Sequence, residues 1–291
     1  MPQSTIAATR PQSPNSLESD LDLPTCHIHF LGGGHMANGI IGGLIHRGIP
    51  ATQISVTEPN AERAQVLREA WNITVSQDAP PADTEVIVLA IKPQVFPTAL
   101  PQLASTLKAG TLVISVAAGI HLHRIQQYLG SGFKLARAMP NMPALIRCGA
   151  TGLFGDSTLT DADRALADNI MRSVGTTLWV ESEDLIDAVT AVSGSGPAYF
   201  FLLMEAMTEA GITLGLSREH SQALTIQTAL GAATLASHSQ HTQTPEHLRQ
   251  QVTSPGGTTA AAINHLIDHQ FPDLITAALT RARDRAIELA R

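Results

Sequence analysis

The sequence predicts an α/β protein in which a doubly wound, mainly parallel sheet is followed by an all-helical C-terminal half. Three observations support this prediction. Short β-rich runs alternate with helical patterns from His27 to about Val180, as in strands joined by crossover helices. After Glu183 the β-rich runs stop and long helical patterns follow. At 291 residues the chain is longer than most domains that have a single hydrophobic core, so two folded domains are expected.

The predicted strands are short and apolar. Residues 86–91 read Val-Ile-Val-Leu-Ala-Ile, an almost continuously apolar run that is typical of a strand covered by helices on both faces. Seven strands are expected, with a weaker candidate at residues 73–75. They are residues 27–31, 53–56, 85–90, 111–117, 134–139, 150–154 and 176–180.

The predicted helices of the second half are rich in small aliphatic residues. They cover residues 197–213, 218–237, 245–252, 258–268 and 271–290. Pro197 and Pro245 stand where a first-turn proline is tolerated, and Gly215 marks a helix end. Few charged faces remain for solvent, so these helices are expected to pack against another subunit and to form a homo-oligomer.

The expected organisation is a disordered tail over residues 1–24, a sheet domain over residues 25–182 and a helical domain over residues 183–291. The tail is rich in Ser, Thr, Pro, Gln and Asn and carries three acidic residues, which argues against a secretory or organellar leader. Cys26 and Cys148 form no disulfide framework, so a reducing, cytoplasmic compartment is expected.

Charge and hydropathy exclude several kinds of partner. With 18 Lys and Arg against 25 Asp and Glu and no basic run, the surface lacks the positive stripe that nucleic acids require. No stretch approaches the roughly 18 to 20 consecutive apolar residues of a membrane span. The twelve histidines have no acidic or cysteine partners at metal-ligand spacing, so no metal site is expected.

A glycine-rich turn follows the first predicted strand. Its residues fit the pattern G-x-G-x-x-A and open an apolar-periodic helix, which is the context of a Rossmann-type dinucleotide site. Glycine allows close backbone approach to a pyrophosphate, and the helix N-terminus favours its charge. The alternative is a structural turn. The expected cofactor-binding residues are Gly32, Gly33, Gly34, His35, Met36 and Ala37.

Glu58 ends the second predicted strand, where an acidic residue would hydrogen-bond the adenosine ribose and favour NADH. Its spacing from Gly32 is somewhat longer than typical, and Arg63 lies close enough in sequence to meet a 2′-phosphate instead. Pro59 and Asn60, which follow, are residues that favour turns, so Glu58 could also be a solvated loop carboxylate. The preference between NADPH and NADH stays open.

Two further strand ends are candidates for cofactor contact. Ala90 ends the apolar strand and Lys92 follows it, at the edge where open α/β sheets bind ligands, and Lys92 could reach a phosphate or ribose. A lysine at this place could equally face solvent. Ala117 ends the next strand among small residues, which would let a nicotinamide ring lie flat against the backbone.

Two Ser- and Gly-rich segments precede helical patterns in the second half. Residues 193–197 read Ser-Gly-Ser-Gly-Pro, and residues 253–259 read Thr-Ser-Pro-Gly-Gly-Thr-Thr. Each is expected to present free N–H groups and hydroxyls at a helix N-terminus, which is a seat for a carboxylate. The alternative is an ordinary N-cap. The glycines beside the hydroxyl residues of the second segment favour substrate binding.

From residue 28 onward the chain resembles pyrroline-5-carboxylate reductase. The most specific piece is Val-Thr-Ser-Pro-Gly-Gly-Thr-Thr at residues 252–259. Three further pieces support it: Ala-Val-Ser-Gly-Ser-Gly-Pro-Ala-Tyr at 191–199, Arg-Ala-Met-Pro-Asn at 137–141 and Ala-Ile-Lys-Pro-Gln at 90–94. His35 departs from the family pattern, in which a smaller polar residue is common. Residues 237–251 hold no evident counterpart of an acidic residue that some relatives place near the substrate.

The resemblance implies NAD(P)H-dependent reduction of 1-pyrroline-5-carboxylate to L-proline by a homodimer or a ring of dimers. It implies that Ser254 and Gly257 hold the substrate carboxylate and that Thr259 lies beside the ring nitrogen as the catalytic hydroxyl. A reductase of another cyclic imine, a β-hydroxyacid dehydrogenase and a silent NAD(P)-sensing protein remain alternatives. The substrate-binding set implied is Val252, Ser254, Gly256, Gly257, Thr258 and Thr259.

Overall fold

The structure is a computed structural model that describes residues 25–77 and 79–290. Their contacts divide into two compact units. The sheet unit contains residues 25–199 and 274–290, and the helical unit is Phe200–Asp273. The predicted tail, residues 1–24, lies outside the described residues, and the predicted boundary after residue 182 stays a prediction.

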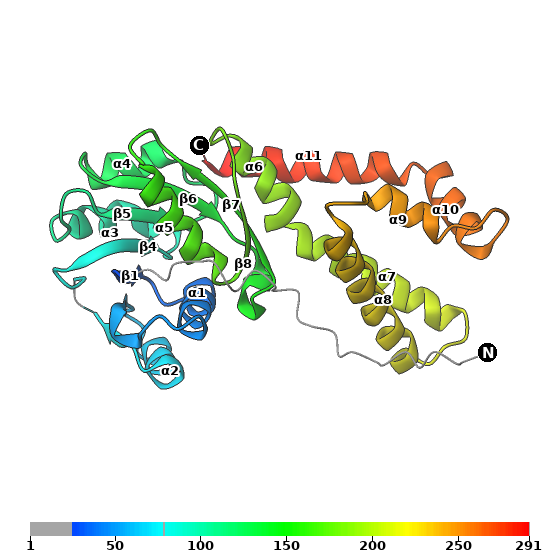
Figure 1. Cartoon of the computed structure of the whole chain (residues 1–291), viewed down its shortest axis with the longest axis horizontal. Helices are drawn as coiled ribbons and strands as arrows, with labels where there is room; N and C mark the ends of the chain where they lie inside the picture. The colour runs from blue at the N-terminus through cyan, green and yellow to red at the C-terminus, as the bar shows by residue number, and fades with distance from the viewer. Residues whose placement is uncertain (1–24, 78, 291) are drawn as a thin grey trace, which may run out of the picture. The chain divides into compact units, whose positions relative to one another are not determined.

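The sheet unit contains one sheet of eight strands in the order β3-β2-β1-β4-β5-β6-β7-β8 (Figure 1). Every neighbouring pair is parallel except β6 and β7. The strands are β1 His27–Leu31, β2 Ile54–Thr57, β3 Thr74–Ser76, β4 Thr84–Leu89, β5 Leu112–Ser115, β6 Lys134–Met139, β7 Gly149–Gly155 and β8 Gly175–Trp179. The predicted doubly wound, mainly parallel sheet is confirmed, because the order 3-2-1-4-5-6 reverses at β1 and β4.

Apolar cores lie on both faces of this sheet because successive side chains of a strand point to opposite sides. On β4, Val86 and Val88 join the core that includes α1, whereas Ile87 and Leu89 join the core under α3 and α4. All four side chains are fully buried. This two-sided burial explains the continuous apolar run in the sequence.

Eleven α-helices occur among the described residues. Those of the sheet unit are α1 His35–His46, α2 Ala61–Trp71, α3 Phe96–Ala104, α4 Leu122–Leu129, α5 Asp161–Arg172 and α6 Leu185–Val189. Short 3-10 segments cover Ala51–Gln53, Pro93–Val95 and Met142–Ile146. Side chains fix several helix starts: Asn60 caps α2, and Thr160 and Asp163 form a reciprocal capping box on α5.

A polar ladder interrupts the apolar core between β1 and β2. The buried His29 ring contacts Ser55 Oγ through Nδ1 at 2.7 Å and Thr57 Oγ1 through Nε2 at 2.9 Å. Burial, together with the neighbouring His27, lowers the pKa of His29 from 6.5 to about 4. His29 is therefore neutral in the folded protein near neutral pH.

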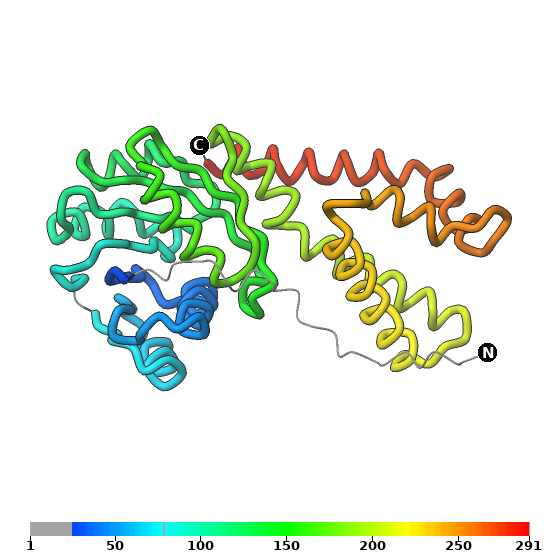
Figure 2. The backbone as a smooth tube through the Cα atoms, viewed as in Figure 1, coloured from blue at the N-terminus to red at the C-terminus, as the bar shows by residue number. Residues whose placement is uncertain are grey.

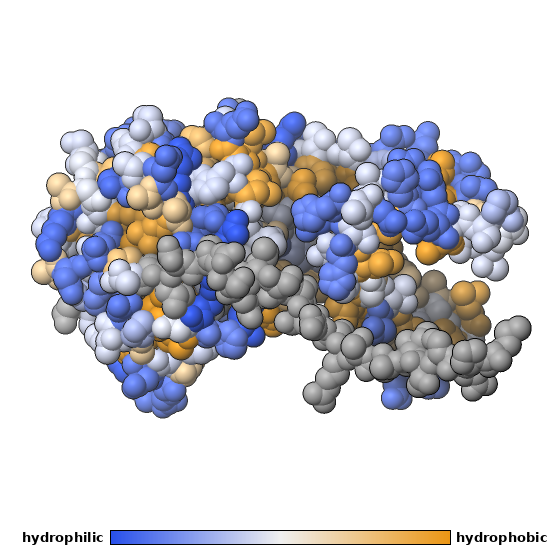
Figure 3. All heavy atoms as spheres, in the orientation of Figure 1, coloured by the Kyte–Doolittle hydropathy of each residue, from blue (hydrophilic) through white to orange (hydrophobic). Residues whose placement is uncertain are grey.

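The helical unit is built from α7 Gly196–Thr213, α8 Arg218–Ser239, α9 Pro245–Gln251 and α10 Thr258–Asp268. Among its described residues the buried ones are polar: Thr208, Ser221 and Thr225. Large apolar side chains are exposed instead, including Leu202, Leu214 at 85%, Leu224 and Leu230. Orange patches over these helices show this apolar surface (Figure 3). A single copy of this unit thus leaves its apolar helices uncovered.

A continuous helical run replaces the loop expected at residues 193–197. After α6 the chain forms a π-turn over Thr190–Gly194 and continues directly into α7. The expectation of free N–H groups there is wrong at Ser195, whose N–H donates to Thr190 O at 2.8 Å. Gly194 allows this path, because an added Cβ would lie 2.6 Å from Met139 Cε.

The last helix, α11 Phe271–Ala290, ends against the sheet unit (Figure 2). Leu289 packs beside Gly119, where an added Cβ would lie 3.4 Å from its Cβ. Ile287 and Ala290 line a cavity of about 590 Å³ together with His121, Asp184 and Asp187. The sheet unit therefore includes residues from both ends of the described chain.

Candidate functional site

The glycine turn after β1 lies at the carboxyl edge of the sheet. Gly32 has φ +97°, and an added Cβ would lie 2.8 Å from Ala90 O, so only glycine fits there. An added Cβ on Gly33 would lie 2.5 Å from Leu67 Cδ1. At Gly34 it would meet no atom of the described residues within 4 Å. The turn is therefore packed at its base and open at Gly34, directly before α1.

The rest of the predicted fingerprint forms the start of α1. Gly34 is the N-cap of this helix and no side chain caps it, so N–H groups of the first turn remain for a ligand. His35 is exposed, Met36 is half-buried, and Ala37 is fully buried against the sheet. These positions match the geometry of an anion site at a helix N-terminus.

Glu58 follows β2 and faces the same turn. Its side chain is 3% exposed and accepts hydrogen bonds from Gly33 N at 2.9 Å, Asn60 N at 2.8 Å and Arg63 Nη2 at 2.9 Å. Burial alone would raise the pKa of this carboxyl, but the hydrogen bonds from Arg63, Asn60 and Gly33 outweigh it and lower the pKa below its usual value. The alternative of a solvated loop carboxylate is therefore wrong.

The other predicted cofactor contacts lie along the same edge. Ala90 follows β4, and its N–H donates to Leu31 O at 2.9 Å, beside the glycine turn. Lys92 is exposed two residues further on. Ala117 is buried after β5, and Val116 N donates to Leu89 O at 3.2 Å. The structure thus brings all ten predicted cofactor-binding residues to the carboxyl ends of β1, β2, β4 and β5.

An apolar cavity of about 350 Å³ opens beside these strand ends. Its walls were not predicted from the sequence, because they come from segments that are separate in the chain. The lining residues include Leu31, Thr57, Pro59, Gln77, Ile91 and Val95. Its size and apolar walls suit a flat heteroaromatic ring such as adenine. Open space at Gly34, an uncapped α1 and this cavity together fit a dinucleotide.

The second predicted loop lies in the helical unit, between α9 and α10. Gly256 has φ +71°, and Gly257 N donates to Ser254 O at 3.0 Å, which closes a tight turn. Gly257 is also the N-cap of α10, which receives no side-chain cap. The alternative of an ordinary Ser or Thr cap is therefore wrong. Val252, Ser254 and Thr258 are exposed, while Thr259 is half-buried at the start of α10.

This turn can bind an anion. Backbone N–H groups at the first turn of α10 have no side-chain acceptor, and the positive helix end adds to their attraction for a carboxylate. Thr253 Oγ1 is already engaged, because it donates to Arg249 O at 2.6 Å. The hydroxyls of Ser254, Thr258 and Thr259 remain as the candidate contacts for a small polar substrate.

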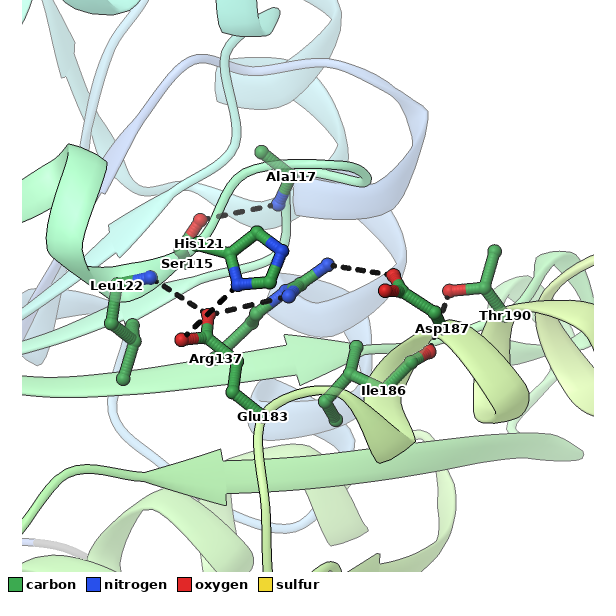
Figure 4. A network of polar contacts seen from close by, with 9 residues as sticks. All are labelled: Ser115, Ala117, His121, Leu122, Arg137, Glu183, Ile186, Asp187 and Thr190. Atoms are coloured by element: carbon green, nitrogen blue, oxygen red, sulfur yellow. Dashed lines mark hydrogen bonds and ion pairs between the residues drawn. The ribbon is translucent and has the colours of Figure 1, made fainter. Parts of the chain in front are cut away.

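A buried charge cluster lies beside the β5–α4 loop and was not predicted (Figure 4). Arg137 of β6 is 1% exposed and pairs with Glu183 at 3.2 Å and with Asp187 at 3.7 Å. Glu183 also accepts a hydrogen bond from Leu122 N at 2.7 Å. The partners are about 46 residues apart in sequence, so no local pattern indicates them.

Comparison with known proteins decides the family. Residues 183–289 match the family model described as pyrroline-5-carboxylate reductase dimerisation, and residues 27–119 match the one described as NADP oxidoreductase, coenzyme F420-dependent. The chain is 47% identical over 270 residues to a pyrroline-5-carboxylate reductase of Pseudomonas aeruginosa, covering 92% of this chain and 98% of that protein. This chain belongs to the pyrroline-5-carboxylate reductase family.

Solved structures of pyrroline-5-carboxylate reductases agree with this assignment. The Coxiella burnetii protein matches with a TM-score of 0.88 and 42% identity, over 92% of this chain and all of that chain. The Plasmodium falciparum protein, solved with NADP bound, matches with a TM-score of 0.78 and 25% identity, over 93% of this chain and all of that one. The family resemblance seen in the motifs is thereby confirmed over nearly the whole chain.

Proposed function

We propose that this chain is a reductase that uses NADPH or NADH to convert 1-pyrroline-5-carboxylate to L-proline, the last step of proline biosynthesis. One observation carries the proposal: identity to a reductase of this name extends through both units, over 92% of the chain. The helical half, which would hold the substrate, matches the reductase family model rather than a general oxidoreductase one.

For the cofactor, we assign the carboxyl edge of the sheet. The N–H groups at Gly34 and the first turn of α1 would hold the pyrophosphate, and Glu58 with Arg63 would face the adenosine ribose. Lys92 and Ala117 would lie nearer the nicotinamide. Bound NAD(P)H supplies the hydride, and the chain supplies orientation.

For the substrate, we assign the turn before α10. Backbone N–H groups and the Ser254 hydroxyl would hold the carboxylate, with Gly257 allowing its close approach. The Thr259 hydroxyl would accept a hydrogen bond from the protonated imine nitrogen and orient the ring. Because solvent can protonate the imine before binding, no dedicated general acid is required from the chain.

A β-hydroxyacid dehydrogenase is the alternative that the sequence disfavours most clearly. Oxidation of a hydroxyl requires a general base, typically a lysine on the long helix after the sheet. That helix, α7, contains no lysine. The test measures NAD(P)H absorbance with 1-pyrroline-5-carboxylate, 1-pyrroline-2-carboxylate and hydroxyacids in parallel. We expect turnover with the first; turnover with only another substrate, or with none, would contradict the proposed function.

The helical half carries a dimerisation domain, and we propose that it forms a homodimer or a ring of dimers. The exposed leucines of α7 and α8 support this, since burying them against a second copy removes apolar surface from water. Sedimentation velocity at micromolar concentration tests the proposal. A single species with the mass of one chain, 30.8 kDa, would contradict it.

We propose a cytoplasmic enzyme that binds neither nucleic acid nor membrane. One helical run among the described residues, Leu185–Thr213, is long and apolar enough to cross a membrane by length and composition. We assign its apolar side chains to subunit contacts, because Asp187 is buried at its start in the Arg137 cluster. Fractionation of cells expressing the chain, with the enzyme recovered from membrane pellets, would contradict this assignment.

A further inference from the structure

Arg137 occupies a place where a charge is expensive. It is the largest fully buried side chain among the described residues, in the middle of the sheet, and it pairs in register with Ser115 of β5. An isolated buried guanidinium is strongly destabilising, and a buried ion pair is often no more stable than well-packed apolar residues. Packing alone therefore does not explain an arginine at this position. Its two carboxylate partners, Glu183 and Asp187, indicate its role.

Glu183 connects Arg137 to the loop after β5. Its Oε1 accepts from Arg137 Nη1 at 3.2 Å and from Leu122 N, the first residue of α4, at 2.7 Å. Its Oε2 lies 3.5 Å from Nδ1 of His121. Figure 4 shows Glu183 between the Arg137 guanidinium and the start of α4. One carboxylate thus fixes the end of the short loop that begins after Ser115 and contains Ala117.

Asp187 connects the same guanidinium to α6. Its Oδ1 lies 3.7 Å from Arg137 Nη2, and α6 continues into the π-turn. A second clamp holds that turn, because Asn141 Nδ2 donates to Ser193 O at 3.0 Å while Asn141 Oδ1 accepts from Ala150 N at 2.9 Å. Arg137 therefore connects the β5–α4 loop to α6, the helix that leads into the π-turn, and Asn141 holds that turn separately.

We propose that Arg137, Glu183 and Asp187 are positioning residues that hold the Ala117 loop in place against the nicotinamide end of bound NAD(P)H. This role rests on the proposed function, because it requires that the nicotinamide lies at Ala117. In this role none of the three side chains touches the reacting atoms. They act by fixing the backbone that the cofactor meets, and a displacement of about 1 Å there is costly for hydride transfer.

Glu183→Gln tests the proposal with little change of shape. The amide can still accept from Leu122 N, but Arg137 then keeps only Asp187 as a carboxylate partner. We expect NADPH to bind about tenfold more weakly, measured by nicotinamide fluorescence, and kcat to fall about tenfold. Calorimetry with 2′,5′-ADP, which lacks the nicotinamide, should show affinity unchanged within about twofold.

Lys134→Gln is the matched control. Lys134 lies on the same strand and pairs with Asp163 at 2.8 Å, away from the carboxyl edge. This variant should bind both NADPH and 2′,5′-ADP like the parent. Equal weakening of both ligands by Glu183→Gln, or no weakening of either, would overturn the positioning role.

Two further variants cover the case in which Glu183→Gln does not fold. Asp187→Asn keeps the Arg137–Glu183 pair and should show the same selective loss for NADPH to a smaller degree. Arg137→Lys, which keeps the charge, should retain more NADPH affinity than Arg137→Met. The reverse order would overturn the proposal. A parent enzyme that fails to reduce 1-pyrroline-5-carboxylate would instead contradict the proposed function, whatever the variants do.

Discussion

The two glycine turns of this molecule differ in what surrounds their glycines. In the turn after β1, added Cβ atoms on Gly32 and Gly33 would collide with Ala90 O and with Leu67. In the turn before α10, an added Cβ on Gly256 would meet no atom of the described residues within 4 Å. An added Cβ on Gly257 would lie 3.1 Å from Ser254 O. The first turn is thus required by the protein's own packing. The second needs a glycine at Gly256 for its φ of +71°, but no described residue crowds that position, so space is left there for a ligand.

The same contrast extends to the units that carry the turns. The sheet unit buries apolar side chains on both faces of its strands, whereas the described part of the helical unit buries three polar residues and exposes many leucines. One unit can form a core within a single chain, and the other needs a partner. Changes in the first turn should therefore affect stability, and changes in the second should affect catalysis.

Gly32→Ala should have the largest effect. The positive φ and the 2.8 Å approach to Ala90 O together should cost about 4 kcal/mol of unfolding free energy. Urea unfolding followed by tryptophan fluorescence measures it, because both tryptophans, Trp71 and Trp179, lie in the sheet unit. Gly34→Ala, in open space, is the control and should weaken NADPH binding with little loss of stability. Equal stability of the two variants would break the comparison.

Thr259→Ala should have the next largest effect. It should lower catalysis and leave stability unchanged. We expect kcat/KM for 1-pyrroline-5-carboxylate to fall on the order of 10²-fold, because one positioning hydroxyl is lost, while the unfolding midpoint stays unchanged. Steady-state kinetics and thermal unfolding measure the two quantities. Thr242→Ala, an exposed threonine in the turn between α8 and α9, is the control. A fall in kcat/KM of less than about threefold would show that Thr259 has no such role.

Lowering the pH from 7 to 5 should destabilise the sheet unit by about 2 kcal/mol through His29. Its pKa is about 4 when folded and 6.5 when unfolded, so the unfolded chain binds more protons between these values. The contribution is fully present above pH 6.5 and is lost as the pH falls toward 4. Urea unfolding of the parent and of His29→Gln at several pH values tests this. The variant should lose less stability over the same interval, and parallel losses would contradict the assignment.

Glu58→Ser should have the smallest effect on catalysis, seen as a change of cofactor choice. If Glu58 faces the ribose, as we propose, removing its carboxylate and freeing Arg63 should raise the NADPH/NADH ratio of kcat/KM about tenfold. Arg63→Ser should lower that ratio. Glu62→Ser, which removes an exposed acid in the first turn of α2, is the matched control. If the ratio is the same in all four proteins, Glu58 does not contact the ribose.

Sequence periodicity located most elements because burial on two faces leaves a strong local pattern. The predicted bounds of β1, β6, α10 and α11 agree with the structure residue for residue. Local pattern does not report pairing partners, so the antiparallel β7 could not be foreseen. Residues 193–197 were misinterpreted because serine, glycine and proline usually mark loops, whereas here Gly194 accommodates Met139 within a continuous helix.

The site was predictable to the extent that it consists of short motifs. All ten predicted cofactor residues lie at one edge of the sheet, since each belongs to the segment that leaves the carboxyl end of β1, β2, β4 or β5. The assignment of Glu58, Thr259 and the other site residues to particular ligand atoms stays a prediction. The Arg137 cluster and the apolar cavity could not be found from sequence, because only the folded sheet brings their separate segments together.

The return of α11 to the sheet unit has a consequence for biosynthesis of the chain. Leu289 and Ile287, which cover Gly119 and the cavity beside Asp187, leave the ribosome only after the whole helical unit has been made. The sheet can form earlier, but the wall beside its β5–α4 loop is completed last. A nascent subunit therefore completes the surface beside its β5–α4 loop only at the moment when its helical unit also becomes able to meet a partner.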